Sequence, residues 1–161
     1  MMRVGLGFDV HAFAAESVTR DLVLGGVVFD GERGLAGHSD ADVVAHAIAD
    51  ALLGAIGAGD IGHHFPNTDE SIRGISSLEI LQRVTALLTE RRARVVNVDA
   101  TVIAETPKIA PHIADMRKKI ADAIGISEFG VSVKATTNER LGTLGRGEGI
   151  AAMAIATVET R

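Results

Sequence analysis

The sequence predicts an α+β fold in a single domain over residues 1–161. A length of 161 residues fits one domain with a sizeable hydrophobic core. Several segments alternate apolar and polar residues with the period of two that is typical of β-strands. Three longer segments repeat apolar residues every three or four positions, as amphipathic helices do. No repeat, low-complexity segment or linker divides the chain.

The composition excludes several classes of function. A net charge of −5 argues against a general nucleic-acid or anionic-membrane surface. Cysteine is absent, so disulfides and thiolate metal sites are excluded, and any metal ligands must be His, Asp or Glu. No apolar run reaches the ~18 residues of a membrane span, and a strand pattern that begins at residue 3 leaves no room for a signal peptide. We therefore expect a cytoplasmic protein.

The first strand is predicted over residues 3–11. Its apolar face is expected to lie in the core and consists of Val4, Leu6, Phe8 and Val10. On the opposite face, two glycines leave space before Asp9 and His11, which project from the same side of the strand. A carboxylate and an imidazole two residues apart can converge on a cation, although an exposed polar strand end would look the same.

A β-hairpin is predicted over residues 22–29, because Gly25-Gly26 suits a two-residue turn. The next helix is predicted over residues 38–53, with Ser39 as its N-cap and a carboxylate in its first turn. One face of this helix carries polar residues spaced four apart, which are Asp42, His46 and Asp50. A solvated edge without function is the alternative, but the glycine-rich polar segment that follows, residues 57–66, favours a ligand site.

The rest of the chain predicts two more helices and three more strands. Residues 62–76 lack periodicity and indicate a loop over a site. The second helix is expected to begin with a capping box of Ser76 and Glu79, and the third to run from near Pro111 to just before Gly125. The strands are predicted over residues 95–104, with Val96 and Val98 on one face, and over residues 131–136 and 150–158. Small side chains in the last strand favour close packing, for example between subunits.

Together these residues suggest metal-assisted phosphate chemistry. Asp9, His11 and His46 offer three ligands with an open fourth position, which is the pattern of a catalytic zinc site. Polar residues near by could orient the metal-bound imidazoles, and these are His38, Asp40, Asp42 and Asp60. Phosphate could be bound by Lys108, Thr136, Thr137 and Arg146. Glu139 could hold a second cation such as Mg²⁺, and a metal beside phosphate suggests phosphoryl transfer. The spacing alone does not identify the substrate.

Seven motifs, in register over essentially the whole chain, resemble those of one family. They are residues 7–13 (GFDVHAF), 37–42 (GHSDAD) with His46, 59–62 (GDIG) with Phe65-Pro66, 97–99 (NVD), 107–108 (PK), 134–137 (KATT) and 145–149 (GRGEG). This set is similar to that of the 2-C-methyl-D-erythritol 2,4-cyclodiphosphate synthases. The resemblance implies a mixed sheet with helices packed on one face. It also implies a homotrimer whose sheets face the trimer axis and whose active sites lie between subunits.

The resemblance further implies a reaction of the non-mevalonate route to isoprenoids. The 2-phosphate of 4-diphosphocytidyl-2-C-methyl-D-erythritol 2-phosphate would attack the β-phosphorus, CMP would leave, and a cyclic diphosphate would form. Zinc would be bound by Asp9, His11 and His46, and Mg²⁺ or Mn²⁺ by Glu139. His38 and Thr137 would stabilise the transition state.

Substrate contacts are implied in the same way. The methylerythritol part would lie against residues 60–62 and 65–69, and the cytidine part against residues 104–110 and 135–137. The full implied set is Ser39, Asp60, Ile61, Gly62, Phe65, Pro66, Asn67, Thr68, Asp69, Ala104, Lys108, Ala135, Thr136 and Arg146.

Two positions depart from the family pattern, and two other functions stay open. Asn67 stands where the family usually has Asp, and Thr143 where many members have Phe at a channel that can hold a prenyl diphosphate beside Arg146. One alternative is a nucleotide hydrolase that uses a zinc-bound water. The other is a trimeric module that binds metal or prenyl phosphate without catalysis.

Overall fold

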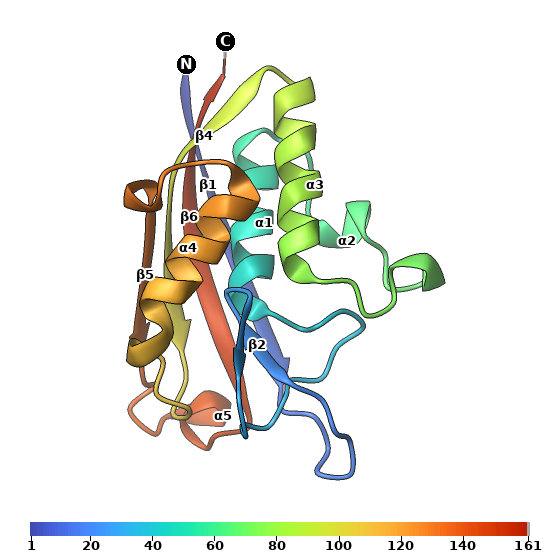
Figure 1. Ribbon diagram of the computed structural model, residues 1–161, viewed down its shortest axis with the longest axis vertical. Helices are drawn as coiled ribbons and strands as arrows, with labels where there is room; N and C mark the ends of the chain where they lie inside the picture. The colour runs from blue at the N-terminus through green and yellow to red at the C-terminus, as the bar shows by residue number, and fades with distance from the viewer. Residues whose placement is uncertain (161) are drawn as a thin grey trace.

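A mixed β-sheet carries the fold, and helices cover one of its faces (Figure 1). The computed structural model describes residues 1–160. Within this range the sheet has four strands in the order β1 (Met2–Ala12), β6 (Gly149–Thr160), β4 (Ala93–Ile103) and β5 (Val131–Thr136). β6 runs antiparallel to both of its neighbours, whereas β5 is parallel to β4. The prediction of an α+β fold is confirmed.

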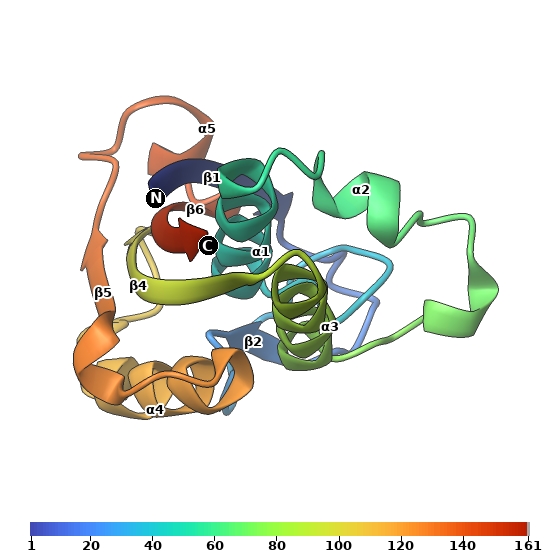
Figure 2. The ribbon, with the colours of Figure 1, turned by 90° about the horizontal axis from the view of Figure 1, so that it is seen from above.

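Three long helices pack on the same side of the curved sheet (Figure 2). They are α1 (Val43–Ala55), which contacts β1 and β6, α3 (Ser77–Glu90), which contacts β4, and α4 (Ile113–Ile124), which contacts β5. Shorter elements connect them, namely β2 (Leu22–Leu24), β3 (Val27–Phe29), α2 (Ile61–His64), α5 (Gly142–Gly145) and three 3₁₀ turns, η1 (Glu70–Ile72), η2 (Ala110–His112) and η3 (Glu128–Gly130). No helix within residues 1–160 is long and apolar enough to cross a membrane.

The predicted apolar face of β1 does not lie in the core of the chain. Leu6 and Phe8 are 62% and 53% exposed, and Val4 and Val10 are exposed as well. Helix α1 instead packs on the other face, where Gly5 and Gly7 are buried against the backbone of the helix. A glycine has no Cβ, so the helix approaches the strand more closely there than any other residue would allow. The prediction placed the face with the larger apolar side chains in the core. In the structure the face with the glycines is buried, because it allows the backbones of strand and helix to pack closely.

The small side chains of β6 also face α1. Ala152, Ala154 and Ala156 lie opposite Asp9, Gly7 and Gly5 in the strand pairing and are buried. Met153 and Ile155 point to the other side and extend the exposed apolar face of β1. Most of the small residues thus serve helix packing inside one chain, and the large ones form the exposed surface.

Asp42 is the N-cap of α1, so the prediction of Ser39 is wrong. Asp42 has an extended backbone, and its Oδ1 accepts hydrogen bonds from the N–H groups of Val44 and Ala45, both at 3.1 Å. The same buried carboxylate accepts from the N–H groups of Gly25 at 2.9 Å and Gly26 at 2.7 Å. Those glycines form the predicted hairpin turn between β2 and β3, with φ values of +57° and +75°.

Asp42→Ala is expected to lower the free energy of unfolding by about 3 kcal/mol. Loss of the cap costs about 1 kcal/mol, and the buried N–H groups of the hairpin lose their acceptor, which costs about 1–3 kcal/mol more. Urea unfolding monitored by circular dichroism measures the change. Asp42→Asn, which keeps one acceptor oxygen, should lie between the wild type and the alanine variant. Equal stability of all three proteins would contradict this role.

Two smaller predictions need correction. A bulge between Val95 and Asn97 shifts the register of β4, so Val95 rather than Val96 lies on the buried face with Val98. Ser76 occupies the N-cap position of α3 but makes no side-chain cap bond, and Glu79 pairs with Arg83 instead. The end of the third helix is confirmed, because Gly125 adopts the left-handed conformation with φ +70° directly after α4.

Candidate metal centre and active site

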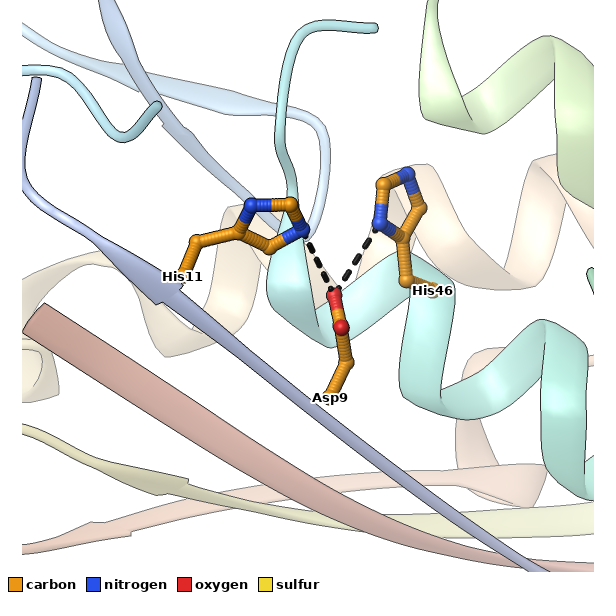
Figure 3. Close-up of side chains that lie close together, drawn as sticks. All are labelled: Asp9, His11 and His46. Carbon is orange, nitrogen blue, oxygen red and sulfur yellow. Dashed lines mark hydrogen bonds and ion pairs between the residues drawn. The ribbon is translucent and has the colours of Figure 1, made fainter. Parts of the chain in front are cut away.

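Three side chains from two elements converge at the edge of the sheet (Figure 3). Asp9 and His11 project from the same side of β1, and His46 comes from the first turn of α1. Asp9 Oδ2 lies 3.1 Å from His11 Nε2 and 3.0 Å from His46 Nδ1. The two imidazole rings are tilted, with centroids 5.6 Å apart. The close packing of α1 on Gly5 and Gly7 brings the helix near enough for this contact.

The charges of the cluster favour an ionised carboxylate. Burial by itself raises the pKa of Asp9, but hydrogen bonds from His11 and His46 outweigh it and hold this pKa well below its usual range. The hydrogen bond to Asp9 raises the pKa of His11, partly opposed by burial. A carboxylate that binds two imidazoles in this way has the negative charge that a bound cation would neutralise.

The three residues fit a metal ion of zinc type. One ligand atom from each lies within 4.8 Å of the others. In a tetrahedral zinc site with bonds of about 2.0–2.1 Å, neighbouring ligand atoms are about 3.3 Å apart. The two distances of 3.0 Å and 3.1 Å from Asp9 Oδ2 are close to that value. A set of two imidazoles and one carboxylate is also a known ligand set of catalytic zinc, which leaves the fourth position open.

In both imidazoles, the ring nitrogen that does not face Asp9 has a hydrogen-bond partner. His11 Nδ1 lies 2.5 Å from the carbonyl oxygen of Ala36. His46 Nε2 lies 2.8 Å from Ser77 Oγ and 3.2 Å from Ser39 Oγ. A hydrogen bond at one ring nitrogen fixes the tautomer and leaves the other nitrogen free to bind a metal. The nitrogens that face Asp9 are therefore the ones available as ligands.

Ser77 is a residue of the candidate site that the sequence analysis does not predict. Its hydroxyl donates to Asp40, its N–H donates to Asp40 Oδ2 at 2.9 Å, and its side chain is fully buried beside His46. Asp40 thus acts on His46 through Ser77, rather than directly as expected. The only signal in the sequence is its position directly after Ser76, the residue predicted to cap the second helix.

The other expected orienting residues have different partners. Asp42 binds the hairpin, and Asp60 caps α2 by accepting from the N–H group of His63 at 2.9 Å. His38 Nε2 lies 3.3 Å from the carbonyl oxygen of Asp69.

Ser77→Ala is expected to weaken zinc binding about 10-fold to 100-fold, because His46 loses the nearer of the two hydroxyls that orient its ring. Competition with a chromophoric chelator measures the affinity. Ser76→Ala is the matched control, since the Ser76 side chain makes no cap bond, and it should bind zinc as the wild type does. An unchanged affinity of Ser77→Ala would show that His46 needs no such support.

A cleft of about 330 Å³ lies beside the three residues. Its lining includes several of the predicted substrate contacts and the predicted catalytic histidine, which are His38, Ser39, Ile61, Gly62, Phe65 and Asn67. Ile72, Ile75 and Ile80 add an apolar wall. Helix α2 is tied to this place because Asp50 accepts from the N–H group of Ile61 at 2.7 Å. Pro66, Thr68 and Asp69 belong to the same loop, next to the lining residues.

Most of the remaining predicted site residues belong to or follow β4 and β5, the two strands farthest from the metal cluster. Ala104 and Lys108 follow β4, Ala135 and Thr136 end β5, and Thr137 and Glu139 follow β5. Arg146 lies in the segment before β6, the strand next to β1. All reach the same end of the sheet as His11, but three strand spacings, about 14 Å, separate β1 from β5. One chain therefore does not bring Thr136, Thr137 and Glu139 to its own metal cluster.

Comparison with known proteins identifies the family of this chain. The model of the YgbB family matches residues 2–159. The chain belongs to the YgbB family. The 2-C-methyl-D-erythritol 2,4-cyclodiphosphate synthase of Thiobacillus denitrificans is 59% identical over 158 residues, which cover 98% of this chain and 97% of that protein. The synthase of Chlorobium luteolum is 54% identical over 159 residues, 99% of each chain. The family that the motifs indicated is confirmed.

Solved structures agree with this YgbB assignment. The bifunctional IspDF from Campylobacter jejuni matches with a TM-score of 0.94 and 38% identity, over 100% of this chain and 43% of that longer one. The IspF of Plasmodium falciparum, solved as a CDP complex, matches with a TM-score of 0.86 and 32% identity, over 99% and 97%. The arrangement of sheet and helices is therefore that of known YgbB-like enzymes.

Proposed function

We propose that this chain converts 4-diphosphocytidyl-2-C-methyl-D-erythritol 2-phosphate to 2-C-methyl-D-erythritol 2,4-cyclodiphosphate and CMP. The observation that carries the proposal is the Asp9–His11–His46 cluster beside a cleft lined by His38 and Ser39. Full-length relatives that bear the name of this synthase support it, as does the CDP bound to the Plasmodium falciparum relative.

In the proposed reaction an oxygen of the 2-phosphate attacks the β-phosphorus, and the bond from that phosphorus to the oxygen bridging to CMP breaks. Asp9, His11 and His46 would hold Zn²⁺, which polarises a phosphoryl oxygen and neutralises its charge. Glu139 would bind Mg²⁺ or Mn²⁺ on the diphosphate. His38 and Thr137 would donate hydrogen bonds to the oxygens that gain charge at the transition state.

The remaining contacts would position the substrate. The polyol would lie along residues 60–62 and 65–69, where Asn67 replaces a carboxylate by an amide that both donates and accepts. The apolar wall of the cleft would exclude water from the reacting phosphate. Exclusion of water favours attack by the 2-phosphate over hydrolysis, which separates the cyclase from the hydrolase alternative.

We also propose a homotrimer with its sheets facing the axis and its active sites between subunits. Two observations support this assembly. The exposed sheet face is a continuous apolar surface of large side chains, which are Val4, Leu6, Phe8, Val10, Met153 and Ile155. Thr137 and Glu139 lie at the opposite edge of the sheet from the metal cluster, so a neighbouring copy would complete each site.

The test is ³¹P NMR of the purified protein with the diphosphocytidyl substrate, Mg²⁺ and Zn²⁺, beside a sample stripped of metal by a chelator. Two coupled resonances of a cyclic diphosphate should appear with CMP, vanish in the stripped sample, and return with Zn²⁺. CMP with an open-chain product would indicate a hydrolase. Bound metal and nucleotide without turnover would indicate a binding module. Sedimentation equilibrium should give the mass of three chains.

A further inference from the structure

The turn that follows β5 has a backbone that L-amino acids rarely adopt. Glu139 and Arg140 are successive non-glycine residues with φ values of +51° and +62°. This left-handed conformation costs free energy, so it persists only when neighbouring groups hold it. Inside the turn, Thr137 Oγ1 accepts from the N–H group of Glu139 at 3.2 Å, and Asn138 Nδ2 donates to the carbonyl oxygen of Leu141 at 2.7 Å.

Glu105, which lies outside the turn, stabilises its backbone with hydrogen bonds. Its Oε1 accepts hydrogen bonds from the N–H group of Asn138 at 3.0 Å and from that of Arg140 at 3.1 Å. These two donors stand on either side of Glu139 in the sequence. One carboxylate oxygen thus fixes the backbone before and after the residue that would bind the second cation.

The topology of the sheet explains how Glu105 reaches this place. β4 and β5 are parallel neighbours, so their carboxyl ends meet at the same edge of the sheet. Beyond the last pair, Ala104 still donates its N–H to the carbonyl oxygen of Thr136 at 3.0 Å. Glu105 comes directly after Ala104 in the segment that follows β4, and the turn of residues 137–140 follows β5.

We propose that Glu105 is a positioning residue, whose carboxylate oxygen holds the turn of residues 137–140 so that Thr137 and Glu139 face the substrate. The proposal rests on the proposed function, which assigns those two residues their roles. Glu105 acts through the backbone and needs no contact with the substrate. Its task requires an acceptor oxygen and not a negative charge, so glutamine can perform it and alanine cannot.

Three variants of the full-length, zinc-loaded protein test this. Glu105→Ala should lower kcat about 10-fold to 100-fold, because a misplacement of about 1 Å costs that much, with the zinc content little changed. Glu105→Gln should lose much less kcat than Glu105→Ala, because the glutamine oxygen can still accept both hydrogen bonds. Glu105→Ala/Arg140→Gly should regain most of the lost kcat, because glycine adopts the left-handed conformation at no cost. Mn²⁺ binding, measured by electron paramagnetic resonance, should weaken in Glu105→Ala but not in the other two variants.

Amide hydrogen exchange tests the contact independently of activity. The N–H groups of Asn138 and Arg140 should exchange slowly in the wild type and at least about 10-fold faster in Glu105→Ala. Rapid exchange in the wild type, or equal losses of kcat in the glutamine and alanine variants, would overturn the proposal. If Glu105→Ala does not fold, the double variant and the wild-type exchange rates still decide it. Failure of the wild type to release CMP would instead refute the proposed function, whatever the exchange rates.

Discussion

His46→Ala is expected to reduce kcat/KM by about 10³-fold or more and to abolish stoichiometric zinc binding. The imidazole is one of three side chains in the cluster, and its Nδ1 lies 3.0 Å from Asp9 Oδ2. Loss of a metal that stabilises charge at the transition state costs several kcal/mol, and each 1.36 kcal/mol is a factor of about ten in rate. Removal of the ring also leaves Asp9 with one histidine partner, His11, which weakens the remaining pair as a chelate.

Atomic absorption for zinc and a coupled assay for CMP measure the two effects. The matched control is His63→Ala, since His63 is exposed and does not line the cleft. It should retain zinc and activity. Activity of His46→Ala within tenfold of the wild type, at full zinc occupancy, would place the metal elsewhere and refute the assignment of the cluster.

Gly7→Ala is expected to destabilise the protein by about 4 kcal/mol or more, above the typical ~1–3 kcal/mol of overpacked sites. A Cβ at this position would fall on the carbonyl oxygen of Ala47 in helix α1. The obstacle is backbone, so a side-chain rotation cannot relieve it, and the helix would have to move away from the sheet. Such a movement would also carry His46 away from Asp9, so zinc affinity should fall together with stability.

Gly54→Ala separates this effect from the general cost of replacing glycine. A Cβ at Gly54, in the last turn of α1, would meet only the carbonyl oxygen of Leu6 at 4.0 Å. Alanine is a better helix former than glycine, so this variant should be stabilised by about 0.5–1 kcal/mol. Thermal unfolding by calorimetry compares the two variants. A Gly7→Ala protein as stable as the wild type would show that α1 and β1 have room to separate.

Periodicity located the four strands of the sheet and the three long helices, because alternation and helical spacing follow directly from backbone geometry. The short helices α2 and α5 lie in segments without such a pattern. Periodicity could not choose the buried face of β1. Both faces of that strand lack charge over residues 4–8, and the choice depends on a helix that arrives from residues 43–55. The cap of α1 was assigned to Ser39 for a similar reason, since only the folded hairpin explains why Asp42 occupies that place.

In the candidate site, too, some residues could be predicted from the sequence and others depend on the folded structure. Asp9 and His11 were detectable because they share one strand face, and His46 because it follows them in a recognisable motif. Ser77 was not detectable, since its link to His46 exists only after α3 has packed against α1. The distance between the metal cluster and Glu139 was also outside the reach of the sequence, because it depends on the order of strands in the sheet.

The bonds of Asp42 have a consequence for how the protein opens. One carboxylate joins the tip of the β2–β3 hairpin to the first turn of α1, elements 17 residues apart in the chain. If either element moves away from the other, the N–H groups of Gly25 and Gly26 lose their acceptor and the buried carboxylate loses two of its donors. The hairpin and the start of the helix should therefore behave as one cooperative unit, which opens in a single step. Since His46 lies in that first turn, opening of this unit should also separate His46 from Asp9 and His11.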